Sequence, residues 1–208
     1  MVKATRSTGA RKGPSKGRAD NGRRPQIIQV STRLFREKGY HATSLDDIAD
    51  RIGFTKPAIY YYFDSKEDIL FSIVDGIVED ALQRMRAIAA RDASAADRLH
   101  DLLVENTRVI LENLDANTVF YNERGLLSPE REKMIRARER AYTKVVRDLY
   151  KEGVAAGELL DIDPTIATST LLGASIWSYR WFDTKGRLSS EQVANNVADL
   201  LTSGYRRL

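Results

Sequence analysis

The chain of 208 residues is 42% apolar and 30% charged and contains no cysteine, which is the composition of a folded globular protein without disulfides, thiolate metal sites or cysteine nucleophiles. No apolar run approaches the roughly 18 residues of a membrane-spanning helix. The basic N-terminus is not followed by the apolar stretch of a secretory signal, so we expect a cytoplasmic protein without membrane contact.

The net charge of +4 is distributed unevenly. Residues 1–24 hold eight Lys and Arg and one acidic residue, a net charge of +7, so the rest of the chain carries −3. With almost no large apolar residue, residues 1–22 are expected to be disordered on their own. A basic arm can lie along DNA and release counterions from its phosphates, but a solubilising leader would have the same composition, and both interpretations stay open.

The first predicted helix covers residues 23–38. Its apolar residues recur with helical spacing, which indicates one buried face, and Gly39 follows the last turn, as is common where helices end. The buried face is predicted to consist of Ile27, Ile28, Val30, Leu34 and Phe35.

Two short helices joined by a tight turn are predicted next. Thr43 or Ser44 can cap the first, with Asp46 or Asp47 as the acidic member of a capping box. Gly53 follows the last apolar residue of this helix, where the backbone often turns left-handed.

The second short helix is predicted to begin after Thr55 and to run for about eight residues, with Pro57 in its first turn. Ile59 and Phe63 form its apolar face. The side chains left to point outward are Lys56, Pro57, Ala58, Tyr60, Tyr61 and Tyr62. This pattern indicates a helix-turn-helix whose second helix has the size to enter a DNA major groove.

Every later segment is also predicted to be helical. A helix capped by Ser65 should run to about residue 88. The helices after it are expected at about 95–113, 116–125, 129–156, 164–183 and 190–206. No segment alternates with the period of a strand, so the predicted fold is all-α with about nine helices.

Residues in and around the two short helices carry a resemblance to a known family. They are the stretch Arg24 to Ala42, Thr43-Ser44-x-x-Asp47-Ile48-Ala49, Gly53-Phe54-Thr55, Ile59-Tyr60-Tyr61-Tyr62-Phe63 and Ser65-Lys66-Glu67. Together they closely resemble the N-terminal domain of TetR-family transcriptional repressors. The resemblance implies a helix-turn-helix DNA-binding domain over residues 23–66, an effector-binding and dimerisation domain over residues 67–208, and no cofactor or metal.

The family motif also implies which residues touch operator DNA. Contacts with base edges are implied for Lys56, Pro57, Ala58, Tyr60 and Tyr61. Contacts with phosphates are implied for Ser44, Tyr60, Tyr62 and Lys66. The chemistry agrees, because a lysine can donate to guanine and hydroxyl groups suit phosphate oxygens. Where this chain has Tyr62 the family more often has histidine, and tyrosine keeps a hydrogen-bond donor at longer reach.

The last two predicted helices have faces suited to close packing. One carries Ala167, Leu171, Ala174 and Ser178 beside Ile166, Gly173, Trp177 and Trp181, and the other carries Val193, Val197, Leu200, Leu201 and Gly204. In the family the last two long helices form a four-helix bundle across a two-fold axis, which implies a homodimer on a pseudo-palindromic operator. The alternative is that these faces pack within one chain.

The resemblance further implies a small-molecule effector that releases the DNA. Its pocket is expected between the helices near residues 97–113, 116–125, 128–156 and 164–183. Candidate lining residues are Asn106, Phe120, Tyr121, Arg124, Trp177, Arg180 and Trp181, although core packing is the favoured interpretation for each aromatic side chain among them. The segments 176–182 and 186–193 resemble members with fatty-acid or acyl-CoA effectors, in which case Arg124 or Arg180 would meet a carboxylate or phosphate.

Two other classes of protein were weighed against this interpretation. An enzyme is disfavoured, because His41 and His100 are most simply solvated and the chain has no phosphate-binding loop, dinucleotide fingerprint or nucleophile elbow. An architectural protein that binds DNA without sequence preference is suggested by the basic N-terminus. Activation in place of repression also stays open, because operator position decides the sign of regulation.

Overall fold

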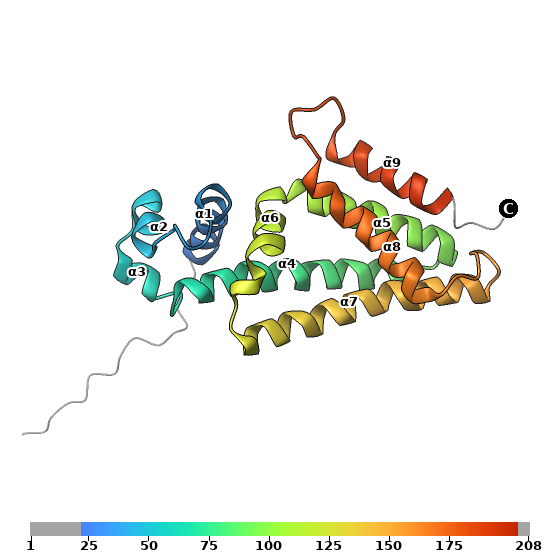
Figure 1. The fold of residues 1–208 in the computed structure, drawn as a ribbon, viewed down its shortest axis with the longest axis horizontal. Coiled ribbons are helices and arrows are strands. Elements are labelled where there is room, and N and C mark those ends of the chain that lie inside the picture. Colours follow the sequence, from blue (N-terminus) through green and yellow to red (C-terminus); the bar gives the residue numbers. More distant parts are fainter. Residues whose placement is uncertain (1–21, 204–208) are drawn as a thin grey trace, which may run out of the picture.

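The computed structural model describes residues 22–203, and this part of the chain is helical with no β-strand. It contains nine α-helices and two short 3-10 helices, which confirms the predicted all-α fold. Figure 1 shows an elongated molecule with three short helices at one end and a larger helical bundle at the other. The basic segment 1–21 lies outside the described residues.

The three helices at one end are α1 (Arg23–Lys38), α2 (Leu45–Ile52) and α3 (Lys56–Tyr60). Their apolar faces meet in one core, as the spacing predicted. Its most deeply buried side chains in these helices and the following turn are Ile27, Leu34, Phe35, Ile48, Ile59 and Phe63.

A single helix, α4 (Lys66–Ala89), runs from this end into the bundle (Figure 1). Its first turns place Ile69 and Leu70 in the core of the three short helices, whereas Met85 and Ile88 lie in the second core. One continuous helix therefore contributes side chains to both cores.

The bundle is built from α5 (Ala95–Glu112), α7 (Pro129–Ala155), α8 (Pro164–Trp177) and α9 (Ser190–Ser203). Its core contains the fully buried side chains of Leu99, Leu102, Leu103, Val146, Tyr150 and Leu171. The short helix α6 (Leu114–Glu123) stands between the bundle and the three N-terminal helices (Figure 1). The 3-10 turn η1 (Arg124–Leu126) follows it. Within the described residues, no helix is long and apolar enough to cross a membrane.

Two predicted helix boundaries were wrong. The helix expected at 164–183 ends at Trp177 and tightens into the 3-10 turn η2 (Ser178–Arg180), because the Ser178 hydroxyl donates to the Ser175 carbonyl at 2.7 Å and draws the chain inward. The helix expected at 116–125 begins two residues earlier, at Leu114. The predicted end of the last helix near residue 206 lies outside the described residues.

Candidate nucleic-acid interface and ligand cavity

The first helix of the helix-turn-helix is held by a complete capping box. The backbone N–H of Asp47 donates to the Ser44 hydroxyl at 3.0 Å, and the backbone N–H of Ser44 donates to the Asp47 carboxylate at 2.8 Å. Hydrogen bonds from the Ser44 side chain and backbone lower the pKa of Asp47 to about 2. Of the two pairs of candidates that the sequence offered, Ser44 and not Thr43 caps the helix, and Asp47 and not Asp46 is the acidic member of the box.

The turn that follows has the left-handed residue that was predicted. Gly53 has a φ of 69°, and the next residue, Phe54, donates its N–H to the Ala49 carbonyl at 2.8 Å. A side chain at this φ is strained. The glycine therefore sets the angle at which α3 leaves α2.

The second helix, α3, presents a polar and aromatic face. Tyr60 and Tyr61 are 49% and 55% exposed, while Ile59 and Phe63 are buried beneath them. Helix α3 has five residues, fewer than the eight expected. The turn after it still keeps one helical hydrogen bond, from Phe63 N–H to the Ile59 carbonyl at 3.0 Å, so both apolar residues reach the core.

The other residues predicted to contact bases flank this face. Lys56 and Pro57 are exposed and Ala58 is half-buried at the start of α3. The Lys56 ammonium forms an exposed ion pair with Asp46 of α2 at 2.8 Å, and this hydrogen bond raises the pKa of Lys56. Exposed pairs of this kind contribute little stability, so Lys56 can exchange its partner for a base edge at small cost.

Three of the residues predicted to contact phosphates, Ser44, Tyr62 and Lys66, already contact other groups within the protein. The Lys66 ammonium donates to the carbonyls of Tyr40 and Thr43, both at 2.7 Å, and its partial burial lowers its pKa. The Ser44 hydroxyl donates to Asp47, and Tyr62 is half-buried with its ring edge-on to Tyr61. Two of the three Lys66 N–H groups hold the turn between α1 and α2, and a phosphate contact through the third stays a prediction.

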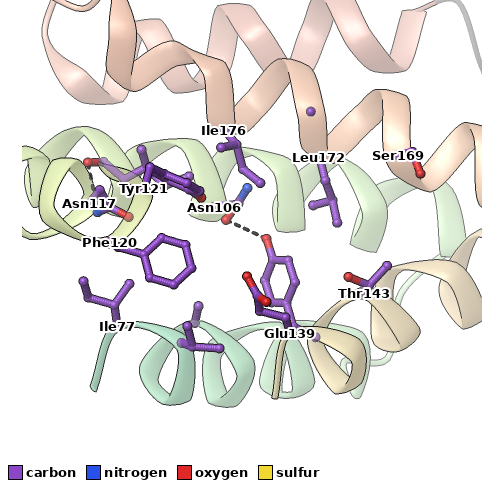
Figure 2. Close-up of a pocket in the computed structure, with 15 residues that line it drawn as sticks. Ile77, Asn106, Asn117, Phe120, Tyr121, Glu139, Thr143, Ser169, Leu172 and Ile176 are labelled. Atoms are coloured by element: carbon purple, nitrogen blue, oxygen red, sulfur yellow. Dashed lines mark hydrogen bonds between the residues drawn. The ribbon is translucent and has the colours of Figure 1, made fainter. Parts of the chain in front are cut away.

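A cavity of about 370 Å³ lies in the bundle where α4, α5, α6, α7 and α8 meet (Figure 2). It is lined by Ile77, Val78, Ala81, Asn106, Ile110, Asn117, Phe120, Tyr121, Glu139, Tyr142, Thr143, Ser169, Leu172, Gly173 and Ile176. Apolar walls with a few polar groups are typical of small-molecule sites, and this volume lies within their usual range of about 300–1,000 Å³.

Neutral polar groups at the cavity form a hydrogen-bonded network. The Tyr142 hydroxyl donates to the side-chain oxygen of Asn106 at 2.8 Å (Figure 2). The Asn106 side-chain amide donates to the hydroxyl of Ser175, which lies behind the lining, at 2.9 Å. Burial raises the pKa values of Tyr142 and Tyr121 well above that of a free tyrosine. Both tyrosines are therefore uncharged near neutral pH, and Tyr142, Asn106 and Ser175 are hydrogen-bonded to one another.

Three of the residues predicted to line the pocket do so, namely Asn106, Phe120 and Tyr121. Arg124 lies outside the lining and forms an ion pair with Glu139, with one nitrogen–oxygen distance of 2.8 Å.

Trp177, Arg180 and Trp181, which were also predicted to line the pocket, do not line this cavity. Trp177 and Trp181 are 59% and 54% exposed, and Arg180 packs against the outer ring of Trp177. Successive side chains of a helix point about 100° apart, so Ile176 faces the cavity and Trp177 turns away from it. The cavity residues of α4 and α7 were not predicted from the sequence. An apolar helical stripe looks the same in the sequence whether it lines a cavity or packs in a solid core.

The helix α6 contacts both the cavity and the three N-terminal helices. It contributes Asn117, Phe120 and Tyr121 to the cavity wall. On its other side Arg36 of α1 forms an ion pair with Asp115, and the backbone N–H of Tyr40 lies 3.4 Å from the carboxylate of Glu123. A group that enters the cavity therefore lies one helix away from α1.

The last two helices expose several large apolar side chains. Ile166 and Trp177 of α8 are 62% and 59% exposed, and Leu200 of α9 is 79% exposed. By contrast Ala167, Leu171 and Val193 are buried within the chain. Of the residues predicted to form the packing faces of the last two helices, some are therefore buried within the chain and others are exposed on its surface.

Both histidines contact other side chains of the protein. His100, which was predicted to be solvated, is half-buried, and its Nε2 lies 2.8 Å from the Asp199 carboxylate, which joins α5 to α9. His41 is exposed and packs edge-on against Tyr40. Within residues 22–203 no cluster of three or more histidine and acidic side chains is arranged to hold a metal ion.

Comparison with known proteins assigns both ends of the molecule. Residues 27–73 match the family described as bacterial regulatory proteins, tetR family, and residues 92–205 match the tetracyclin repressor-like C-terminal domain. A transcriptional regulator of the TetR/AcrR family from Thermobifida fusca has a solved structure that is 66% identical in sequence, with a TM-score of 0.73 over 90% of this chain and 100% of that one.

More distant relatives match over nearly their whole length. The transcriptional repressor KstR2 of Mycobacterium tuberculosis is 27% identical over 190 residues, which cover 90% of this chain and 94% of KstR2. AibR, solved with isovaleryl coenzyme A and operator DNA, is 25% identical with a TM-score of 0.78, over 86% of this chain and 98% of AibR. The chain therefore belongs to the TetR family of bacterial regulatory proteins, and it is a helix-turn-helix transcriptional regulator, not an enzyme.

Proposed function

We propose that the protein is a dimeric repressor that binds a pseudo-palindromic operator and is released from it by a small molecule, a fatty acyl or acyl-CoA compound. The observation that carries this proposal is the position of α6, which forms one wall of the cavity and packs on α1. A ligand that displaces α6 must also shift the first helix of the DNA-binding end. Ligand binding and DNA binding are thereby coupled through one element.

On the DNA side, we propose that Lys56, Pro57, Ala58, Tyr60 and Tyr61 reach base edges, and that Ser44, Tyr60, Tyr62 and Lys66 contact phosphates. The exposed outer face of α3 supports the first group, because its buried residues leave the tyrosines and the lysine free to enter the major groove. The DNA-binding domain is taken as residues 23–66 and the effector-binding and dimerisation domain as residues 67–208.

The dimer is proposed to form through α8 and α9. Exposed large apolar side chains favour a protein interface, and Ile166 and Trp177 of α8 and Leu200 of α9 are such side chains. A two-fold axis there places two copies of α3 on one side of the dimer. The half-sites of the operator are then expected one helical turn of DNA, or a multiple of it, apart.

The effector is proposed to carry a fatty acyl group. The cavity is mostly apolar, its one charged side chain, Glu139, is paired with Arg124, and its volume suits a short to medium aliphatic chain. AibR, a relative with the same fold, was solved with an acyl thioester of coenzyme A and with operator DNA. We propose that Asn106, Phe120 and Tyr121, which line the cavity, contact the effector.

The test is binding of the purified protein to the DNA upstream of its own gene and to random DNA of equal length, over a salt series. A preference of about a thousandfold or more for the upstream DNA is expected of a specific regulator. Equal affinity with a steep salt dependence would favour the architectural alternative, driven by the basic N-terminal segment. Deleting residues 1–22 should lower the salt slope, and an unchanged slope would make that segment a leader only.

The same DNA then reports release by acyl compounds. Gly173→Leu should block release, because a Cβ placed at Gly173 meets no atom within 4 Å and the side chain can occupy the cavity. Gly76→Leu is the matched control, since Gly76 is equally open but lies outside the lining. Release of the Gly173→Leu variant at the wild-type concentration would refute the proposed cavity.

A further inference from the structure

The cavity opens between α7 and α8. Its exposed lining residues are Ser169 and Gly173 of α8, and the half-buried Glu139 and Thr143 lie on α7. Figure 2 shows Thr143 and Ser169 at the same end of the cavity. A ligand too long for the cavity would therefore emerge beside Glu139 and Thr143.

A second hollow begins at the same two residues. This groove of about 650 Å³ follows α7 and is lined by Arg136, Glu139, Arg140, Thr143, Lys144, Arg147, Asp148 and Lys151. Glu139 and Thr143 line both the cavity and the groove. The apolar cavity and the basic groove are therefore adjacent and share a rim.

The cavity itself has no cation for an anionic ligand. Its one charged lining residue is Glu139, whose carboxylate is paired with Arg124. Both ends of the Asn106 amide are also occupied. Burying an unpaired charge is costly, so a carboxylate or phosphate is not expected inside the cavity. This differs from the prediction that Arg124 meets such a group.

The groove, in contrast, has cations without partners. Arg136 is paired with Glu132 at 2.6 Å and Lys144 with Asp148. Within residues 22–203, Arg140, Arg147 and Lys151 have no ion pair or hydrogen-bond partner, and the Nε of Arg147 is buried and unpaired. These three side chains recur on one face of α7 over about 16 Å, at 1.5 Å per residue.

We propose that the effector is an acyl thioester of a phosphorylated carrier of the coenzyme A type, with its acyl chain in the cavity and its phosphates on Arg140, Arg147 and Lys151. This inference rests on the proposed function and adds the location and chemistry of the head group. Three unpaired cations match several phosphate charges better than the single charge of a free fatty acid. The thioester lies at the shared rim, beside Thr143 and Glu139.

The experiment measures binding of the full-length protein to saturated acyl-CoA thioesters from acetyl to palmitoyl and to the corresponding acyl-pantetheines, which lack every phosphate. Calorimetry on the wild type should show tighter binding of the coenzyme A ester. The double variant Arg140→Gln with Arg147→Gln should weaken acyl-CoA binding by about a hundredfold, at about tenfold for each charge-assisted bond. Binding of acyl-pantetheine should be unchanged.

Lys133→Gln is the matched control, because Lys133 is an exposed cation of the same helix outside the groove. It should bind acyl-CoA as the wild type does. The inference is overturned if the double variant also binds acyl-CoA like the wild type, if acyl-pantetheine binds the wild type as tightly, or if no acyl-CoA binds. A separate result keeps the proposed function distinguishable from this inference. If an acyl-pantetheine releases the operator and Gly173→Leu blocks that release, the proposed function holds even when the inference fails.

Discussion

The two ends of this molecule differ in how their functional surfaces are built. The DNA-binding end relies on contacts between residues close in sequence, such as the Ser44–Asp47 capping box and the turn at Gly53. The cavity at the other end is assembled from five helices that are spread over residues 77–176. The helix-turn-helix is therefore determined by contacts between residues near one another in the sequence, whereas the ligand cavity depends on the packing of the whole bundle.

The largest expected effect is on the packed end. Leu102 is fully buried in the bundle core, so Leu102→Ala should lower the free energy of unfolding by about 2–5 kcal/mol. Urea denaturation followed by circular dichroism measures the change. Leu126→Ala serves as the control, because Leu126 is 38% exposed and should cost much less. Equal losses for both variants would contradict the view that the bundle core holds this end together.

The next largest effect is expected on DNA affinity, from substitutions on the exposed face of α3. Lys56→Ala and Tyr60→Ala should each reduce specific DNA affinity about ten- to a hundredfold, as loss of a base contact does. Fluorescence anisotropy with the upstream DNA measures this, and sedimentation should find the dimer intact because both side chains are exposed. Wild-type operator affinity in either variant would show that α3 is not placed in the groove as proposed.

A smaller effect tests whether the turn is locally determined. Gly53→Ala should destabilise the protein by about 1–2 kcal/mol, because alanine is strained at a φ of 69°. Gly76→Ala, in the middle of α4 and with open space around it, should instead stabilise by about 0.5–1 kcal/mol. The two substitutions are chemically identical, so changes of the same sign in thermal or urea unfolding would refute the assignment of the turn.

The smallest effect concerns the capping box. Ser44→Ala should cost about 1 kcal/mol near neutral pH. Thr55→Ala should cost less, because Thr55 precedes α3 without a side-chain cap bond. Both values come from urea unfolding curves.

The capping box also predicts a pH dependence. The folded pKa of Asp47 is about 2, below the ordinary value of 3.8. Its contribution to stability is therefore present above about pH 4 and is lost as the pH falls towards 2. The Ser44→Ala variant should show a weaker decline over this window than the wild type, and parallel curves would show that the hydroxyl does not hold the carboxylate ionised.

The sequence alone determined the order of the helices and most of their ends. Caps such as Ser44, Ser65 and Asp163 accept hydrogen bonds from backbone N–H groups within three residues, and glycines such as Gly53 and Gly157 adopt positive φ where the helices stop. These signals act within one turn of chain, so they can be read without knowing the fold. The family motif over the two short helices depends on the same local geometry.

Only the tertiary structure decided which side chains line the cavity. Trp177 was predicted to line the pocket but is exposed, and Arg124 was predicted to meet an effector's carboxylate or phosphate but is paired with Glu139 of α7. The orientation of a helix about its axis and the pairing of distant charges depend on which neighbours fill the space. A helical stripe in the sequence is the same for a solid core, a cavity and an interface, and packing between distant segments alone distinguishes the three.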